Sequence, residues 1–145
     1  MQARLKEDLK AAMRSGDKLR RDTIRLLMAE FKKAQIAKGG ELSDEENMTL
    51  LTREAKKRRE AAEAYRKGDR TDLAEKEEGE LLVVEAYLPQ QLSEDEVKGI
   101  IAEIVAAVQP QGPRDMGKVM GQLMPKIRGR FDGKAASALV KASLM

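Results

Sequence analysis

Two residue types that commonly carry chemistry are missing from this chain of 145 residues. There is no cysteine, which excludes disulfide bonds and thiolate catalysis. There is no histidine either, and histidine is the commonest general base and the commonest metal ligand. A zinc site is improbable in a chain that has neither cysteine nor histidine. We therefore expect no metal, no cofactor and no catalytic residue in this chain.

Aromatic residues and long apolar runs are also scarce. Phe, Tyr and Trp together make up 3% of the residues, so aliphatic side chains, Met and Ala must fill the core. No apolar run approaches the roughly 20 residues of a membrane-spanning helix. Residues 1–7 contain no apolar segment of the kind found in signal peptides. These observations predict a cytoplasmic protein that has no membrane partner.

Charged residues are abundant, at 37% of the chain, but they are unevenly distributed. Residues 1–40 carry 11 basic and 5 acidic side chains, and residues 41–70 carry 8 of each. Residues 71–112 carry 2 basic and 10 acidic side chains, whereas residues 113–145 carry 7 basic and 2 acidic ones. The net charge of +3 thus combines a basic start, an acidic middle and a basic tail, and basic regions are candidates for binding polyanions.

The spacing of apolar residues predicts an all-α protein with seven helices and no strand. The expected helices cover residues 2–14, 18–38, 44–67, 72–87, 94–108, 114–124 and 133–144. A change in character near residues 88–92 predicts two parts, an N-terminal bundle of about four helices (1–90) and a small three-helix C-terminal domain (91–145).

Several helix ends have recognisable signals. Residues 43–46 and 93–96 each read Ser-x-x-Glu, the pattern of a capping box, in which serine and glutamate side chains bond to backbone N–H groups at the start of a helix. Gly39 is expected to end the second helix, because glycine readily adopts the left-handed conformation found there. Thr71 is expected to cap the fourth helix, and Pro125 is expected to end the sixth.

A basic segment at residues 125–134 is the strongest candidate binding site. The predicted nucleic-acid contacts, one of which lies just upstream, are Lys118, Lys126, Arg128, Arg130 and Lys134. The same segment contains Gly129, Asp132 and Gly133, to which we assign structural roles. Cations beside the free N–H groups of a helix start can bind phosphate. The alternative is a solvated basic turn in which Asp132 simply caps the last helix.

Two glycines in the sixth helix, Gly117 and Gly121, lie four residues apart on one face. Glycine costs roughly 0.8–1.0 kcal/mol relative to alanine inside a helix, so a structural or functional reason is expected. Close packing of another helix is the favoured interpretation, and close approach of an RNA backbone is the alternative.

Two further charged runs are interpreted as solvated helix faces. The basic run at residues 56–59 resembles a nucleic-acid patch, but Glu54 lies four residues before Arg58, and Glu63 four residues after Arg59. Those spacings predict exposed ion pairs on the helix surface. The acidic run at residues 75–80 has no histidine, cysteine or glycine-rich loop beside it that would make a catalytic site.

The ordered motifs of the C-terminal half closely resemble the YqeY-like family. They are LPQQLSEDE at residues 88–96, DMGKVMG at 115–121 and GRFDGK at 129–134; DTIRLL at 22–27 is also similar to this family. The resemblance covers essentially the whole chain. It implies a four-helix bundle followed by a three-helix tail of the GatB/YqeY type. This tail is shared with the B subunit of the tRNA-dependent glutamine/asparagine amidotransferase, where it is a tRNA-recognition appendage.

The resemblance leads to three hypotheses for function. The first is a non-catalytic module that binds tRNA or associates with it, and the second is an adaptor for a translation-related protein. The third is a carbon–nitrogen ligase with glutamine as amido donor, a label often attached to the family. We interpret that label as inherited from the larger enzyme, because this chain has no nucleotide-binding loop and no activated nucleophile. The sequence leaves the oligomeric state open.

Overall fold

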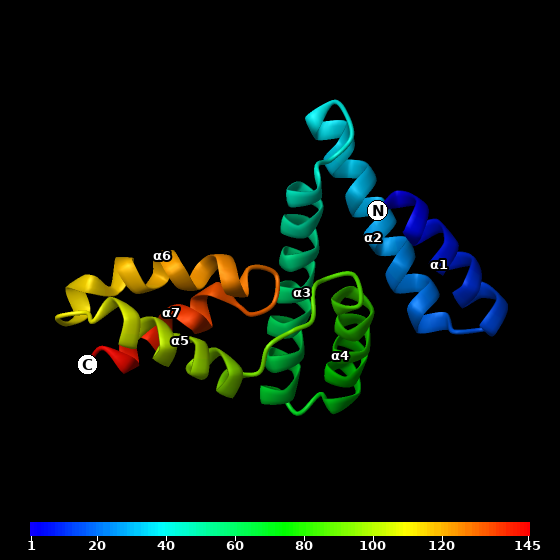
Figure 1. Ribbon diagram of the computed structural model, residues 1–145. Helices are drawn as coiled ribbons and strands as arrows, with labels where there is room; N and C mark the ends of the chain where they lie inside the picture. The colour runs from blue at the N-terminus through cyan, green and yellow to red at the C-terminus, as the bar shows by residue number, and fades with distance from the viewer. The chain divides into compact units, whose positions relative to one another are not determined.

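A computed structural model describes residues 1–145 and consists of helices joined by short loops (Figure 1). The helices are α1 (Gln2–Ser15), α2 (Lys18–Lys38), α3 (Asp44–Lys67), α4 (Thr71–Glu85), α5 (Glu94–Val108), α6 (Met116–Ile127) and α7 (Gly133–Ser143), and a short 3₁₀ turn at Pro113–Asp115 precedes α6. The prediction of an all-α protein with seven helices is confirmed. None of these helices is both long and apolar enough to cross a membrane.

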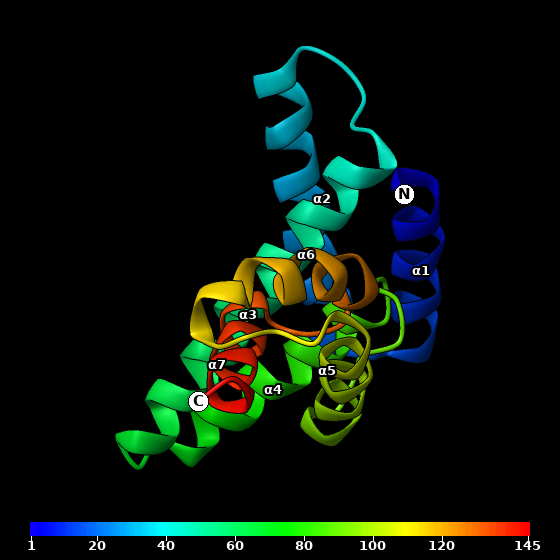
Figure 2. The same cartoon turned by 60° about the vertical axis from the view of Figure 1, so that its left-hand side comes forward.

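The chain forms two compact units, Met1–Leu88 and Pro89–Met145. In the first unit α1 packs on α2, α3 packs on α4, and α2 also contacts α4. Figure 1 shows α1 beside α2, and Figures 1 and 2 show α3 beside α4. The central residues of its core are fully or almost fully buried: Leu5, Ala12, Ile24, Leu27, Phe31, Leu50, Leu51, Ala55 and Val84.

The second unit is a bundle of the three short helices α5, α6 and α7. The apolar positions of α5 recur at helical spacing, and they meet one face each of α6 and α7. Its buried core comprises Val97, Ile101, Ile104, Val119, Leu123, Ile127, Ala136 and Val140. No residue of the first unit belongs to this core, so each unit buries its own apolar side chains.

Both predicted capping boxes are formed. Ser43 accepts a hydrogen bond from the Glu46 backbone N–H at 3.1 Å, and the Glu46 carboxylate accepts one from the Ser43 N–H at 3.0 Å. Ser93 and Glu96 repeat this exchange at the start of α5. Gly39 ends α2 at φ +83°, a left-handed conformation that glycine adopts without strain.

Two predicted helix ends are wrong. Thr71 does not cap α4; it is the first helical residue, Arg70 occupies the cap position, and no side chain bonds to the helix start. Pro125 does not end α6, which continues to Ile127. Proline has no N–H to donate to the Gly121 carbonyl four residues earlier. Gly121 lies on the exposed side of α6, where solvent can take that bond.

The close contact between α2 and α4 depends on a glycine. A β-carbon placed on Gly79 of α4 would lie 2.9 Å from a methyl carbon of Leu19, closer than two carbons pack. The absent side chain thus makes room for Leu19 at the crossing of the two helices. The helix α4 continues unbroken through Gly79 despite the low helix propensity of glycine.

Three charged side chains that were expected on solvated faces are buried instead. Glu54, Arg58 and Glu80 are 3%, 7% and 9% exposed. The expected pairing of Glu54 with Arg58 is present at 3.0 Å, but α4 packs along α3 and the pair lies in the interior. Burial raises the pKa of Glu80 above its ordinary value, and repulsion from Glu77 adds to this effect.

Candidate nucleic-acid interface

The turn between α6 and α7 is fixed by its own backbone. The N–H groups of Arg130 and Phe131 both donate to the Ile127 carbonyl, at 2.8 and 3.1 Å. Gly129, which precedes these two residues, is buried and has φ +74°. This is the left-handed region, which residues with a β-carbon rarely adopt. The structural role predicted for Gly129 therefore has a physical basis in this turn.

The segment that precedes α5 is bonded to this turn by three hydrogen bonds. The Gln91 side-chain amide donates to the Gly129 carbonyl at 2.8 Å, and the Leu92 N–H donates to the Arg130 carbonyl at 2.8 Å. In return, the Arg130 Nε donates to the Gln90 carbonyl at 2.9 Å. Part of the Arg130 guanidinium is thus engaged in holding the C-terminal unit together.

The other predicted cations lie on the surface of α6, the turn and α7. Lys118, Lys126, Arg128 and Lys134 are exposed. The exposed Lys118 ammonium lies 3.6 Å from the carboxylate of Asp115, which is partly buried and lies one turn earlier. Lys126 and Lys134 make no salt bridge. The structure therefore gathers Lys126, Arg128 and Lys134 around one turn, and it places Lys118 two turns earlier on α6.

The start of α7 is capped by the chain itself. Its first residue is Gly133, and the Asp132 carboxylate accepts a hydrogen bond from the Ala135 N–H at 3.0 Å. This carboxylate occupies the place where a bound phosphate would meet the helix N–H groups. Of the two interpretations of this segment, the structure favours the cap, and any phosphate contact falls to the cations alone.

Gly117 and Gly121 face away from the core of the C-terminal unit. Both are exposed, and a β-carbon at either position would meet no atom within 4 Å. The favoured interpretation, close packing of another helix within this chain, is therefore wrong. Together with Pro125, the two glycines leave a strip of α6 without bulky side chains, and helical spacing places Lys118 beside it. A partner backbone could approach the helix closely along this strip.

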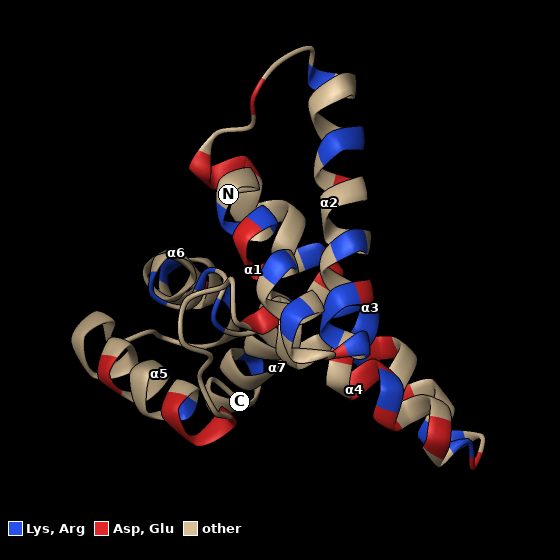
Figure 3. Ribbon diagram, turned by 90° about the vertical axis from the view of Figure 1, so that its right-hand side faces the viewer, with Lys and Arg blue, Asp and Glu red and all other residues tan.

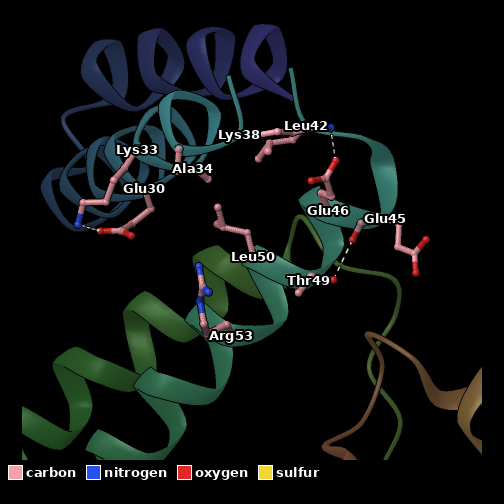
Figure 4. Close-up of a pocket in the computed structure, with 11 residues that line it drawn as sticks. Glu30, Lys33, Ala34, Lys38, Leu42, Glu45, Glu46, Thr49, Leu50 and Arg53 are labelled. Atoms are coloured by element: carbon pink, nitrogen blue, oxygen red, sulfur yellow. Dashed lines mark hydrogen bonds and ion pairs between the residues drawn. The ribbon is translucent and has the colours of Figure 1, made fainter. Parts of the chain in front are cut away.

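A cleft of about 700 Å³ between α2 and α3 is a second place where charges converge (Figure 4). Its lysines already have partners, since Lys33 lies 3.7 Å from Glu30 and Lys38 is paired with Glu46. The hydrogen bond from the Lys38 ammonium, and to a smaller extent the one from the Ser43 N–H, lowers the pKa of Glu46 to about 2. These internal pairs leave Arg53 as the lining cation that could meet an anionic ligand, so this cleft is a weaker candidate.

The sequence also missed two features that the structure makes visible. One is the burial of Arg58, because a four-residue spacing to an acid is the same on a buried and on an exposed face. The other is the orientation of the N-terminal cations. The basic composition of residues 1–40 does not say which face of α2 its cations occupy.

Comparison with known proteins supports the motif-based resemblance. The model of the family described as "Yqey-like protein" matches residues 2–144. A protein of Lachancea thermotolerans named "Altered inheritance of mitochondria protein 41, mitochondrial" is 30% identical over 99% of this chain and 78% of its own length. Its namesake in Pyrenophora tritici-repentis is 33% identical over 88% of this chain and 71% of its own length.

A shorter similarity extends to part of a large enzyme. A glutamyl-tRNA(Gln) amidotransferase subunit from Thermococcus gammatolerans is 44% identical over 57 residues, which are 37% of this chain and 9% of that protein. The predicted relation to the amidotransferases is thereby confirmed. The names of the relatives from Lachancea and Pyrenophora both place those proteins in mitochondria, so the cytoplasmic location predicted from composition is wrong.

Proposed function

Because this chain belongs to the family of YqeY-like proteins, we propose that it is a non-catalytic RNA-binding module that contacts tRNA through its C-terminal unit. The observation that carries the proposal is the surface of α6 and the following turn. Exposed cations lie on the same helix and turn as the strip formed by Gly117 and Gly121, where a β-carbon would meet no atom within 4 Å. Cations position a phosphate backbone, and bare helix surface permits close approach.

The segment shared with the amidotransferase supports tRNA as the ligand. The name of that relative refers to glutamyl-tRNA(Gln), and the similarity covers only 9% of it. This chain has no Trp, and its Phe and Tyr residues make up 3% of the total, which provides few platforms for stacking bases. We therefore propose contacts to the backbone and shape of the RNA rather than to its bases.

A second candidate function is docking to a protein, as an adaptor. It is favoured by an apolar groove of about 540 Å³ between α5 and α7, lined by Ile101, Val105 and Leu139 among others. Grooves of this kind can accept an apolar helix face from a partner. Retention of a partner protein after nuclease treatment, with no binding of tRNA by the purified chain, would favour this function.

The test of RNA binding is fluorescence anisotropy with labelled tRNA over a range of salt concentrations. The variant K118A/K126A/K134A removes three exposed cations and leaves Arg130 in place, because Arg130 also holds the turn. If each lysine contacts one phosphate, we expect the variant to bind more weakly by about tenfold or more, and the slope of log K against log salt to fall by about 2–3.

A matched control removes the same charge elsewhere. Lys10, Lys67 and Lys98 are each paired with a glutamate, at 3.5, 3.8 and 3.5 Å, and K10A/K67A/K98A should leave most of the affinity. If both variants lost the same affinity for tRNA, binding would depend only on the net charge of the protein and not on a site in the C-terminal unit. Absence of binding by the unchanged protein at low salt would refute the proposed function.

A further inference from the structure

The helix α2 has two sharply different faces. Its inward face carries Ile24, Leu27 and Phe31, all fully buried in the core of the N-terminal unit. Its outward face carries Lys18, Arg25 and Lys32, which are seven residues apart and therefore follow one another along the helix at intervals of two turns. All three are exposed, and bands of Lys and Arg recur along α2 in Figure 3. We call these three residues the α2 stripe.

The α2 stripe is not neutralised by the chain itself. Lys18, Arg25 and Lys32 make no salt bridge, unlike Lys33 on the flank of the helix, which pairs with Glu30. The acid on the outward face is Asp22, whose carboxylate lies 2.9 Å from the Arg21 Nε. Arg21 lowers the pKa of Asp22, and Arg25 and Lys76 of α4 contribute to the same effect. Three cations therefore surround one carboxylate, and positive charge remains in excess.

The spacing of the α2 stripe suits an extended polyanion. The 14 helical steps from Lys18 to Lys32 rise by about 21 Å along the helix axis, with a cation at each end and one in the middle. A nucleic acid strand repeats its negative charge at short, regular intervals over such a length. One strand of RNA lying along α2 could therefore meet all three side chains.

A membrane surface fits the same helix less well. Helices that bind in the plane of a membrane bury a continuous apolar face in the lipid. The apolar face of α2 is already buried against α1 and α4. Leu19, Leu26 and Ile36 of α2 are exposed, at 37%, 50% and 72%. Leu19 packs against Gly79 of α4, and Leu26 and Ile36 are separated by ten residues, so the three form no continuous apolar face.

We infer that the α2 stripe of the N-terminal unit is a second contact for the RNA phosphate backbone, in addition to the cations of the C-terminal unit. This inference rests on the proposed function and extends it to a surface outside the three-helix tail. Contacts of this kind carry no base specificity, so the stripe should contribute affinity and salt dependence for tRNA and for an unrelated RNA duplex alike.

The test uses the full chain with the substitutions K18A/R25A/K32A, alongside K118A/K126A/K134A and the control K10A/K67A/K98A. Binding of labelled tRNA and of an unrelated RNA duplex is measured by anisotropy over a range of salt concentrations. We expect the stripe variant to lose about tenfold or more in affinity and to lower the salt slope by about 2–3, with the control little changed. Circular dichroism verifies that each variant is folded.

The outcomes separate the two proposals. If the stripe variant behaves like the control while the tail variant loses binding, the stripe inference is wrong and the proposed function stands. If the stripe variant loses binding and the tail variant does not, the inference stands and the tail site is wrong. If the unchanged protein binds neither RNA, both are wrong. Binding to phosphatidylserine vesicles that the stripe variant loses, with RNA binding unaltered, would also overturn the inference in favour of a membrane.

Discussion

Glu54 and Arg58 lie one helical turn apart on α3, and the structure buries both of them. The guanidinium donates to the Glu54 carboxylate at 3.0 Å and to the Glu54 carbonyl at 3.1 Å. The Arg58 Nε is buried without an acceptor. Removing two charges from water offsets most of their mutual attraction, so such a pair adds little net stability. Each partner nevertheless depends strongly on the other, because a single buried charge is costly.

We expect Arg58→Met to lower the free energy of unfolding by about 3 kcal/mol, because it leaves the Glu54 carboxylate buried without its closest partner. Lys57 lies 3.5 Å from the other Glu54 oxygen and compensates only in part, since its side chain is exposed. The double variant E54L/R58M should recover most of the loss, because it removes both charges. Urea unfolding followed by circular dichroism measures these differences.

The exposed pair of Glu63 and Lys67, at 3.8 Å, provides the control for this experiment. Replacing Lys67 with Met should change the free energy of unfolding by less than about 0.5 kcal/mol. If R58M proved as mild as K67M, or if the double variant were less stable than R58M, the pair would not be acting as a buried, mutually dependent unit.

At the scale of the helices, local signals in the sequence predicted most of what the structure contains. The capping boxes at Ser43 and Ser93 form because the bonds involved span only three residues. Predictions failed where the outcome depends on a distant segment or on solvent. Arg58 is buried because α4 covers α3. Pro125 is tolerated inside α6 because Gly121, whose carbonyl loses its usual helical donor, is exposed to solvent.

The candidate site was predictable in its residue types but not in its geometry. The motif at residues 129–134 indicates a basic turn before the last helix, and the structure contains such a turn between α6 and α7. Only the structure shows that Arg130 bonds to the Gln90 carbonyl and that Asp132 closes the helix start. The outward positions of Gly117 and Gly121 were missed for the same reason, since helical spacing places them on one face without saying what that face meets.

The glycines of α6 give an element-scale prediction. Replacing Gly117 and Gly121 with alanine should stabilise the C-terminal unit by about 1 kcal/mol per site, because alanine favours the helix and its methyl group meets no atom within 4 Å. If an RNA backbone approaches this strip, the same methyl groups should weaken binding of tRNA. We therefore expect higher stability in urea unfolding together with lower affinity in anisotropy.

Gly99 of α5 is the matched control, because it is also exposed, helical and free of neighbours within 4 Å. Gly99→Ala should raise stability by a similar amount and leave the affinity for tRNA unchanged. A double variant of α6 that is more stable and binds tRNA as tightly as the unchanged protein would show that RNA does not approach the helix at this strip.

At the scale of the whole molecule, each unit has a core of its own. The buried residues of the first core belong to residues 5–87, and those of the second to residues 97–140. The predicted boundary lay at residues 90 and 91, whereas the compact units divide between Leu88 and Pro89. The segment at residues 89–92 is bonded to the turn after α6, which accounts for its place in the second unit.

This arrangement predicts that residues 89–145 fold in isolation, and that residues 93–145 fold less stably. The shorter fragment lacks the three hydrogen bonds that Gln90, Gln91 and Leu92 make with Gly129 and Arg130. At about 1 kcal/mol for each bond, the loss should be about 2–3 kcal/mol, which is large for a unit of this size. Circular dichroism during urea unfolding should show a cooperative transition for the longer fragment at a clearly higher midpoint. Equal midpoints would mean that the segment at residues 89–92 is only a tether, whereas an unfolded longer fragment would mean that the C-terminal unit depends on the helices before it.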